Sequence, residues 1–170
     1  MPALDLLFAR RSIRRFTAAP VSDDDERRLL EAAMAAPSAK DLRPWHFVVV
    51  RERATLDALA AGHPFGAMLA EATLAVAVLG DPAVNGDYWV VDCAAATENL
   101  LLAATALGLG ACWIGMHPRE ERKGFVRELL GIPAEIEILS LVAVGHPAEG
   151  KPPRTRFDAA RVHRERWPRG

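Results

Sequence analysis

The residues best suited to chemistry form a cluster of arginines around one serine, in the stretch ARRSIRRF (residues 9–16). The cluster consists of Arg10, Arg11, Arg14 and Arg15 on either side of Ser12. A guanidinium group matches phosphate oxygens with two parallel N–H donors, and a serine hydroxyl supplies a further donor. A solvated helix end or a set of surface ion pairs would also explain several arginines together. The central serine favours a binding site for one phosphate group.

The charge of the whole chain narrows the choice of phosphate ligand. The chain has 21 Lys+Arg and 22 Asp+Glu, which gives a formal net charge of -1 at pH 7. A general nucleic-acid binder is usually more basic than this. We therefore expect a small-molecule phosphate and no nucleic-acid partner.

A second polar stretch, APSAKDLRPWHFVVV (residues 36–50), lies between a predicted helix and a predicted strand. It places Ser38, Asp41 and Arg43 in a loop, and Pro44 with Trp45 fixes the exit into the strand. Taken alone, this stretch fits an ordinary surface loop as well as a binding loop.

Several familiar motifs are absent or misplaced. The glycines of GLGAC (residues 108–112) follow a helix and precede a strand, which reverses the order of a dinucleotide-binding fingerprint. The five histidines lack the spacing of metal ligands, so we predict turn or packing roles for them and no metal site. Cys93 and Cys112 are too few for a disulfide framework, and residues 1–9 do not read as a secretory signal. These features indicate a cytoplasmic protein.

The elements that must position these residues follow from hydrophobic periodicity and turn signals. At 170 residues, 51% of them hydrophobic, the chain is predicted to form one domain, residues 1–170. Ser22 is the predicted N-cap of the first helix, with acidic residues in its first turn. The predicted helices are 22–37, 53–61, 65–70, 87–107 and 118–130, and the predicted strands are 45–50, 73–80, 111–115 and 137–144.

The predicted helix 87–107 is apolar around nearly its whole circumference. A helix of this kind must be buried on every side, and one small domain has too few layers to cover it, so we expect a partner subunit. Residues 99–118 carry no formal charge over a length that could cross a bilayer. Gly108 and Gly110 interrupt that run, which indicates a helix end followed by a strand and no membrane span.

Four motifs in order, RxSxRxF, PSxxxxxPWxFVVV, LGLGACWIG and LVAVGHP followed by KPPRxRF, resemble the nitroreductase family of FMN-dependent oxidoreductases. The resemblance extends over essentially the whole chain. It implies an α+β fold, a nitroreductase-like sandwich in which helices wrap a mixed, mostly antiparallel sheet. It also implies an intertwined homodimer with FMN at the subunit interface, so the expected phosphate is that of FMN.

The resemblance assigns roles to residues in three regions. The ribityl phosphate is expected to contact Arg10, Ser12, Arg14, Arg154 and Arg156, while the Arg11 backbone reaches the flavin ring edge. The other subunit is expected to lay one loop against the isoalloxazine: Pro37, Ser38 and Ala39. The backbone expected to approach flavin N5 and O4 is that of Trp113, Ile114 and Gly115, where a glycine allows a close approach.

Three residues, in two stretches of the chain, depart from the common family pattern. Asp41 and Arg43 stand where many members carry an amide pair, and Ala67 stands where relatives often carry a lysine near flavin N1 and O2. We expect Arg43 to supply the positive charge that Ala67 lacks and so to stabilise reduced flavin.

The function implied by the resemblance is a two-step electron transfer. NADH or NADPH reduces flavin N5 and leaves, and an electron-poor acceptor, a nitroaromatic or a quinone, then binds to the same face in a ping-pong mechanism. No acid or base residue stands out as catalytic. The alternatives are a flavin-binding or sensing module without turnover, and a dehalogenase or enoate reductase of the same family.

The C-terminal segment 151–170 changes in composition to KPPRTRF and then to a charged tail. We expect this tail to dock on the partner subunit, with Phe157 and Trp167 as apolar anchors. The alternative is a flexible basic tail.

Overall fold

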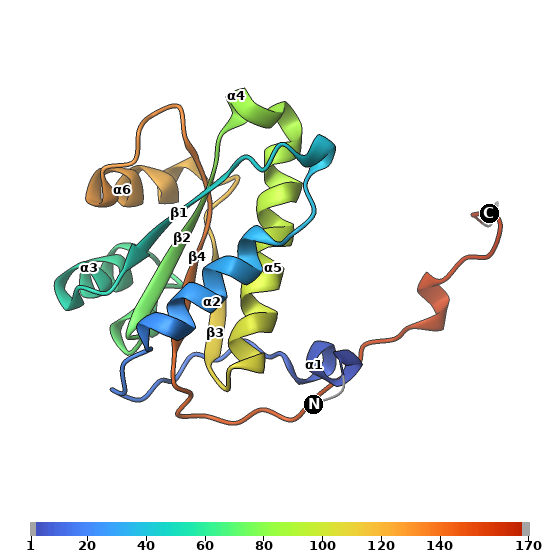
Figure 1. Cartoon of the computed structure of the whole chain (residues 1–170), viewed down its shortest axis with the longest axis horizontal. Coiled ribbons are helices and arrows are strands. Elements are labelled where there is room, and N and C mark those ends of the chain that lie inside the picture. The colour runs from blue at the N-terminus through green and yellow to red at the C-terminus, as the bar shows by residue number, and fades with distance from the viewer. Residues whose placement is uncertain (1–2, 168–170) are drawn as a thin grey trace.

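Four strands form one antiparallel sheet in the order β1-β2-β4-β3. The computed structural model describes residues 3–167 (Figure 1). The helices are α1 (Ala3–Ala9), α2 (Asp23–Met34), α3 (Arg53–Gly62), α4 (Pro82–Asn85), α5 (Trp89–Ala106) and α6 (Glu120–Leu130). The strands are β1 (Trp45–Val50), β2 (Leu74–Gly80), β3 (Gly110–Gly115) and β4 (Glu137–Gly145). Short 3₁₀ helices are η1 (Ala39–Asp41), η2 (Ala67–Ala70), η3 (Gly86–Tyr88) and η4 (Ala159–Arg161).

The two central strands, β2 and β4, are buried on both faces. Along β2, Leu74, Val76 and Val78 belong to one hydrophobic core, and Ala75 and Ala77 belong to the other. This alternation follows from the two-residue period of a strand. The sheet therefore divides the interior into two apolar layers, each of which needs helices to cover it.

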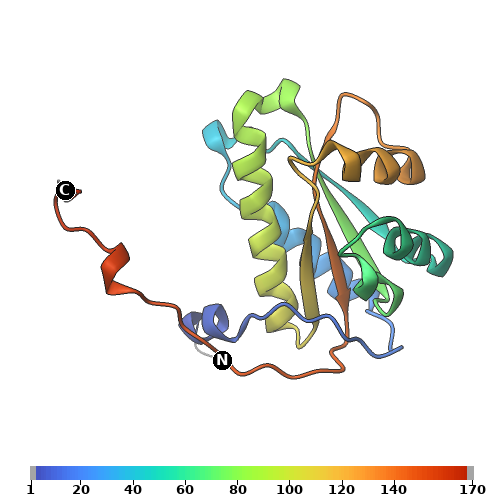
Figure 2. The same cartoon turned by 180° about the vertical axis from the view of Figure 1, so that it is seen from behind.

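Helices cover both faces of the sheet. α2 and α5 pack on one face, and α3 and α6 pack on the other (Figures 1 and 2). α2 begins as predicted, because the Ser22 hydroxyl accepts a hydrogen bond from the Asp25 N–H at 3.0 Å. The predicted α+β fold, in which helices wrap a mostly antiparallel sheet, is confirmed.

The element boundaries differ from the predicted ones in a few places. The helix predicted at 65–70 is only the 3₁₀ helix η2, because the Phe65 N–H bonds to the ring of His63 in a tight turn that precedes it. α5 begins at Trp89 and α6 at Glu120, two residues later than predicted in each case. The sequence analysis did not predict α1, which the apolar N-terminal segment forms against α5.

α5 is buried on the side that faces the sheet and more open on the other. Cys93, Ala96 and Leu100 have no exposed surface, whereas Val91 on the outer side is 59% exposed. The uncharged run 99–118 is divided between the end of α5, a turn and β3. Among residues 3–167, no helix combines the length and apolar character that crossing a bilayer would require.

The C-terminal segment leaves the body of the molecule beside α1 and then extends away from it (Figures 1 and 2). The Arg154 N–H donates to the Phe8 carbonyl at 3.1 Å, which holds the start of this segment to α1. Beyond that point Phe157 is 80% exposed and Trp167 is 77% exposed. The two predicted apolar anchors therefore have large exposed surfaces within one chain.

Candidate functional site

The N-terminal arginine segment lies directly along the edge strand β3. A parallel bridge joins Ser12 to Ala111, and the Ile13 N–H donates to the Ala111 carbonyl at 3.0 Å. Gly110 allows this close packing, because a Cβ atom there would lie 2.6 Å from the Ile13 side chain. The pairing brings Arg14 close to the end of β3, although the two segments are far apart in the sequence.

Arg14 and the end of β3 line one cavity of about 460 Å³. Trp113, Ile114 and Gly115, the residues expected on one side of the flavin, contribute to its wall, and Ala67 borders it as well. A Cβ atom built on Gly115 would meet no heavy atom within 4 Å, so the space beside this backbone is open. A flat ring can therefore approach the main chain closely at this point.

Three other predicted phosphate ligands, Arg10, Arg154 and Arg156, lie where the tail begins, together with Arg11, whose backbone was expected at the flavin ring edge. Arg10 forms an ion pair with Glu98 at 3.3 Å, and Arg11 donates to the Pro152 carbonyl. Desolvation, and then the positive charges of Arg11, Arg156 and Arg10, lower the pKa of Arg154. This concentration of positive charge is the arrangement expected around a phosphate group.

The Ser12 backbone is tied to the same region. Its carbonyl accepts a hydrogen bond from Lys151 Nζ at 2.6 Å, and Lys151 also pairs with Glu149 at 3.0 Å. Glu149 in turn accepts the Arg14 N–H at 2.6 Å. Backbone and side-chain contacts thus join the segment that carries Ser12 and Arg14 to Glu149 and to Lys151, the first residue of KPPRTRF.

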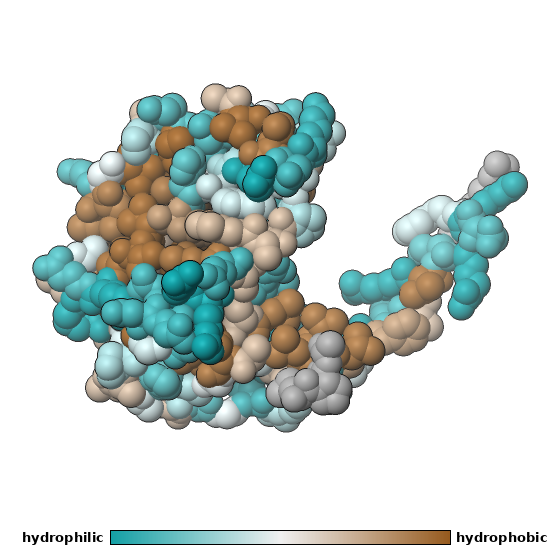
Figure 3. Space-filling model, in the orientation of Figure 1, coloured by the Kyte–Doolittle hydropathy of each residue, from teal (hydrophilic) through white to brown (hydrophobic). Residues whose placement is uncertain are grey.

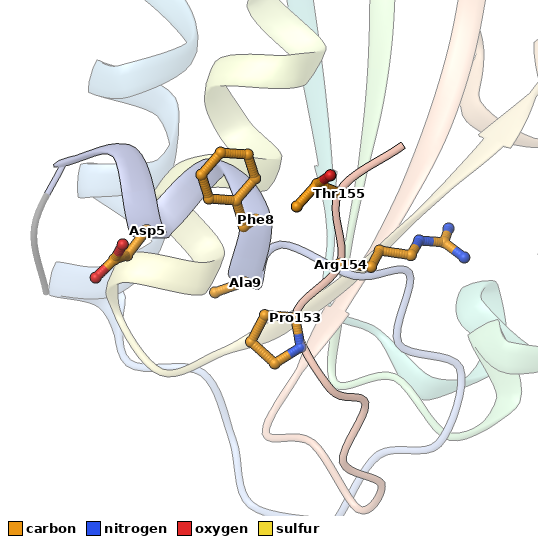
Figure 4. A pocket seen from close by; sticks show the side chains of 6 residues that line it. All are labelled: Asp5, Phe8, Ala9, Pro153, Arg154 and Thr155. Carbon is orange, nitrogen blue, oxygen red and sulfur yellow. The ribbon is translucent and has the colours of Figure 1, made fainter. Parts of the chain in front are cut away.

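A second cavity, of about 530 Å³, lies between α1 and the start of the tail. Figure 4 shows Phe8 and Ala9 of α1 on one side and Pro153 and Thr155 on the other, with the Arg154 side chain directed away from α1. The docking of the prolines on α1 therefore leaves this guanidinium outside the space between α1 and the tail.

The loop that precedes β1 lies at the opposite end of the molecule from the arginine cluster (Figure 1). The Ser38 hydroxyl accepts the Arg43 N–H at 3.0 Å, and the Arg43 guanidinium pairs with Asp41 at 3.3 Å. Lys40, Asp41 and Arg43 have φ angles of 57°, 55° and 51°, which are left-handed values that side chains other than glycine disfavour. Within a single chain, the loop residues predicted to contact flavin do not line the cavity. These residues are Pro37, Ser38, Ala39, Asp41 and Arg43.

A buried carboxylate holds this loop in its unusual conformation. Asp92 of α5 is only 4% exposed, and its Oδ1 accepts the Ala39 N–H at 2.9 Å. Asn85 donates to the other Asp92 oxygen and also to the Ala39 carbonyl, the latter at 3.3 Å. The sequence analysis missed this network. The signal that could have revealed it is Asp92 itself, an acidic residue in a mostly apolar helix.

The sequence analysis also missed two residues that line the cavity, His63 and Arg122. The predicted turn role of His63 is correct, since its ring accepts the Phe65 N–H at 3.1 Å. Arg122 lies on α6, and nothing in the sequence pattern distinguishes it from the other charged residues of that helix. Ala67 thus shares its cavity with Arg14 and Arg122, whereas Arg43 lies elsewhere in the same chain.

Known proteins resemble this chain over nearly its whole length. The sequence model of the Nitroreductase family matches residues 7–75 and 60–146. A protein of Archaeoglobus fulgidus, provisionally named NADH dehydrogenase/NAD(P)H nitroreductase, is 46% identical over 170 residues, which cover 96% of this chain and 98% of the relative.

Solved structures give the same result. A protein of Bacteroides thetaiotaomicron with the same provisional name superimposes with a TM-score of 0.95 at 41% identity, covering 98% of this chain and 99% of that one. A provisionally named nitroreductase in complex with FMN, from Desulfovibrio desulfuricans, superimposes with a TM-score of 0.84 at 34% identity, covering 99% of both chains. With its fold, its cavity and its sequence in agreement, the chain belongs to the nitroreductase family.

Proposed function

We propose that this chain is an FMN-dependent oxidoreductase that passes electrons from NADH or NADPH to a small electron-poor acceptor. The observation that carries the proposal is the cavity in which Arg14 meets Trp113, Ile114 and Gly115, the residues expected on one side of the flavin. The name of the Archaeoglobus relative and the FMN in the Desulfovibrio structure support the same chemistry. Nitroaromatics and quinones are the proposed acceptors.

The residues present fit FMN at both of its ends. The open space beside Gly115 suits the flat ring, and Arg14 lines the same cavity without a carboxylate partner among residues 3–167. For the phosphate, Arg10, Arg154 and Arg156 lie at the start of the tail, where the positive charges of Arg11, Arg156 and Arg10 act on Arg154. These residues, with Ser12, are the ones that would hold the cofactor.

The complete site belongs to a homodimer. No residue of the loop 37–43 lines the cavity of its own chain, so the predicted contact of this loop with flavin requires a second copy. Two surfaces support an assembly of this kind. One is the partly open outer side of α5, and the other is an apolar patch on α1, made by Leu4, Leu7 and Phe8 (Figure 3).

The chemistry depends on what the cavity offers to the cofactor and to the substrates. FMN, when bound, takes up a hydride from the reduced nicotinamide and later gives electrons to the acceptor. Arg14 places positive charge in the cavity, where it would stabilise the negative charge of the reduced cofactor. Donor and acceptor bind to the same open face in turn, which is the basis of the proposed ping-pong order.

Absorbance and turnover of the purified protein test the proposal. The protein should be yellow, or become yellow with added FMN, and it should oxidise NADH or NADPH steadily when menadione is present. Yellow protein without turnover would favour a flavin-binding or sensing module. Colourless protein that does not take up FMN would show that the proposed function is wrong.

A further inference from the structure

One edge of the cavity carries a buried ring nitrogen for which the described part of the chain supplies no hydrogen-bond partner. His63 is 4% exposed, and its Nδ1 accepts the Phe65 N–H at 3.1 Å, which places the proton of the neutral ring on Nε2. Nε2 has no hydrogen-bond partner among residues 3–167. A buried donor left unpaired costs about 1–3 kcal/mol, so a ligand that accepts this bond would be favoured.

A guanidinium lies on the same edge. Arg122 lines the cavity and stands 5.4 Å from the centre of the Phe65 ring. Its Nη1 donates to the Gly115 carbonyl at 3.4 Å, and no carboxylate of residues 3–167 lies within 4.0 Å of it. Glu120, two residues earlier on α6, bonds instead to Lys123 at 2.6 Å. Arg122 therefore has N–H donors and a positive charge available to a ligand.

The two groups act on each other electrostatically. Burial, and then the positive charge of Arg122, lowers the pKa of His63, while the backbone of Gly115 acts in the opposite direction. The histidine is thus neutral near pH 7 and offers one N–H beside one guanidinium. This pair matches a carboxylate, whose two oxygens can each accept a charge-assisted bond.

We propose that His63 and Arg122 form an anion subsite that binds the carboxylate of an aromatic electron acceptor. The proposal rests on the proposed oxidoreductase function and names its substrate class. The Phe65 ring and the Met68 side chain border the same cavity, so an aromatic ring that carries the carboxylate finds apolar contacts beside the two donors. The phosphates of a nicotinamide dinucleotide are separated from the reacting ring by a ribose, which suits this edge less well.

A matched pair of acceptors tests the subsite. 4-Nitrobenzoate carries the carboxylate, and methyl 4-nitrobenzoate is its neutral ester. Arg122→Gln should lower kcat/KM for 4-nitrobenzoate about tenfold or more, mainly through KM, since it removes a charge-assisted hydrogen bond. The same substitution should leave kcat/KM for the neutral ester within about twofold of the wild-type value. Arg119→Gln is the control, because Arg119 precedes the same helix but does not line the cavity, and it should change neither acceptor.

A second substitution isolates the histidine donor. Asparagine at this position can accept the N–H two residues later through its own side chain, so His63→Asn keeps the turn and removes Nε2–H. His63→Asn should also lower kcat/KM for 4-nitrobenzoate more than it lowers kcat/KM for the ester. In the double variant, the fold-loss in kcat/KM for 4-nitrobenzoate should be smaller than the product of the two separate fold-losses, because both groups hold one carboxylate.

Calorimetric titration with benzoate separates this proposal from the oxidoreductase function, because it requires no turnover. Benzoate should bind to the wild-type protein and bind at least about tenfold more weakly to Arg122→Gln, even if the protein oxidises no nicotinamide. Equal binding to both proteins, or no binding to the wild type, would overturn the subsite. So would equal losses for the acid and the ester, or an effect confined to the KM for NADH or NADPH.

Discussion

At the scale of single residues, the environment of His63 makes stability depend on pH. The folded protein lowers the pKa of this histidine from the model-compound value of 6.5, through burial and then through Arg122. Above pH 6.5 the ring is neutral in both the folded and the unfolded chain, and its pKa shift has no effect there. As the pH falls below 6.5, the unfolded chain binds the proton more readily, and the fold loses stability.

Urea unfolding between pH 7.5 and pH 5 measures this effect. We expect the free energy of unfolding to fall as the pH drops below about 6.5, and to fall less steeply in His63→Asn, whose asparagine at this position does not titrate. Above pH 7, the free energy of unfolding should depend on pH in the same way in both proteins. An identical slope in both would mean that His63 keeps its ordinary pKa in the folded protein.

Only part of the candidate site could be predicted at this scale. Ser12 and Arg14 could be predicted from the local cluster of arginines around one serine, and the segment Trp113–Gly115 was predicted from the family resemblance alone. His63 and Arg122 meet in the cavity only through the packing of α6 against α3, a contact that no spacing in the sequence encodes. The hydrogen bond between Asp92 and the Ala39 N–H could not be predicted for the same reason, since the two residues are 53 positions apart.

At the scale of elements, one buried lysine joins α6 to β4. Lys123 is 2% exposed, and its Nζ lies 2.6 Å from a carboxylate oxygen of Glu120 and 2.6 Å from one of Glu137. Burial alone would lower the pKa of Lys123, but the two carboxylates outweigh it and raise the pKa. The lysine is therefore charged, and removing it leaves the partly buried Glu137 without a partner.

Lys123→Met keeps the length of the side chain and removes its charge, so it should destabilise the fold by about 1–3 kcal/mol in urea unfolding. Adding Glu137→Gln should recover much of the loss, because it removes the unpaired carboxylate. Arg27→Met, which breaks the exposed pair with Glu31, is the control and should leave stability unchanged. A Lys123→Met protein as stable as the wild type would show that this bridge contributes nothing.

The tail permits a second test at this scale, which rests on the proposed function. Arg154→Ala with Arg156→Ala removes two charge-assisted contacts to the FMN phosphate, each worth roughly 1.5–3 kcal/mol, so FMN should bind at least about a hundredfold more weakly. The affinity for riboflavin, which has no phosphate, should change little. Equal weakening of both flavins, measured by fluorescence titration, would mean that the tail supports the fold or the dimer instead.

The regular elements were largely predictable from the sequence, and the irregular ones were not. β1 has the predicted bounds, because six apolar and aromatic residues follow the rigid Pro44. The loop 37–43 has three residues with positive φ and no glycine, so its shape depends on bonds from Asp92 and Asn85 and not on local preference. A tertiary contact of this kind is outside the reach of turn rules.

At the scale of the whole molecule, the proposed dimer can be tested on α5. Ala95→Glu places a charge on a partly buried position of a helix with few polar residues. We expect the variant to lose both its partner and its flavin, as measured by light scattering and by flavin absorbance. Ala106→Glu, at the exposed end of the same helix, is the control and should remain a yellow dimer. A yellow dimeric Ala95→Glu protein would mean that this side of α5 lies outside the interface.

α5 holds two parts of the chain that the proposed dimer assigns to different sites. Asp92 anchors the loop offered to the partner's flavin, and Glu98 pairs with Arg10, which belongs to the chain's own site. The two anchors are six residues apart, about 9 Å along a helix that does not stretch. A shift of this helix on filling one site would therefore move a loop of the other, and we expect the two flavins to bind cooperatively.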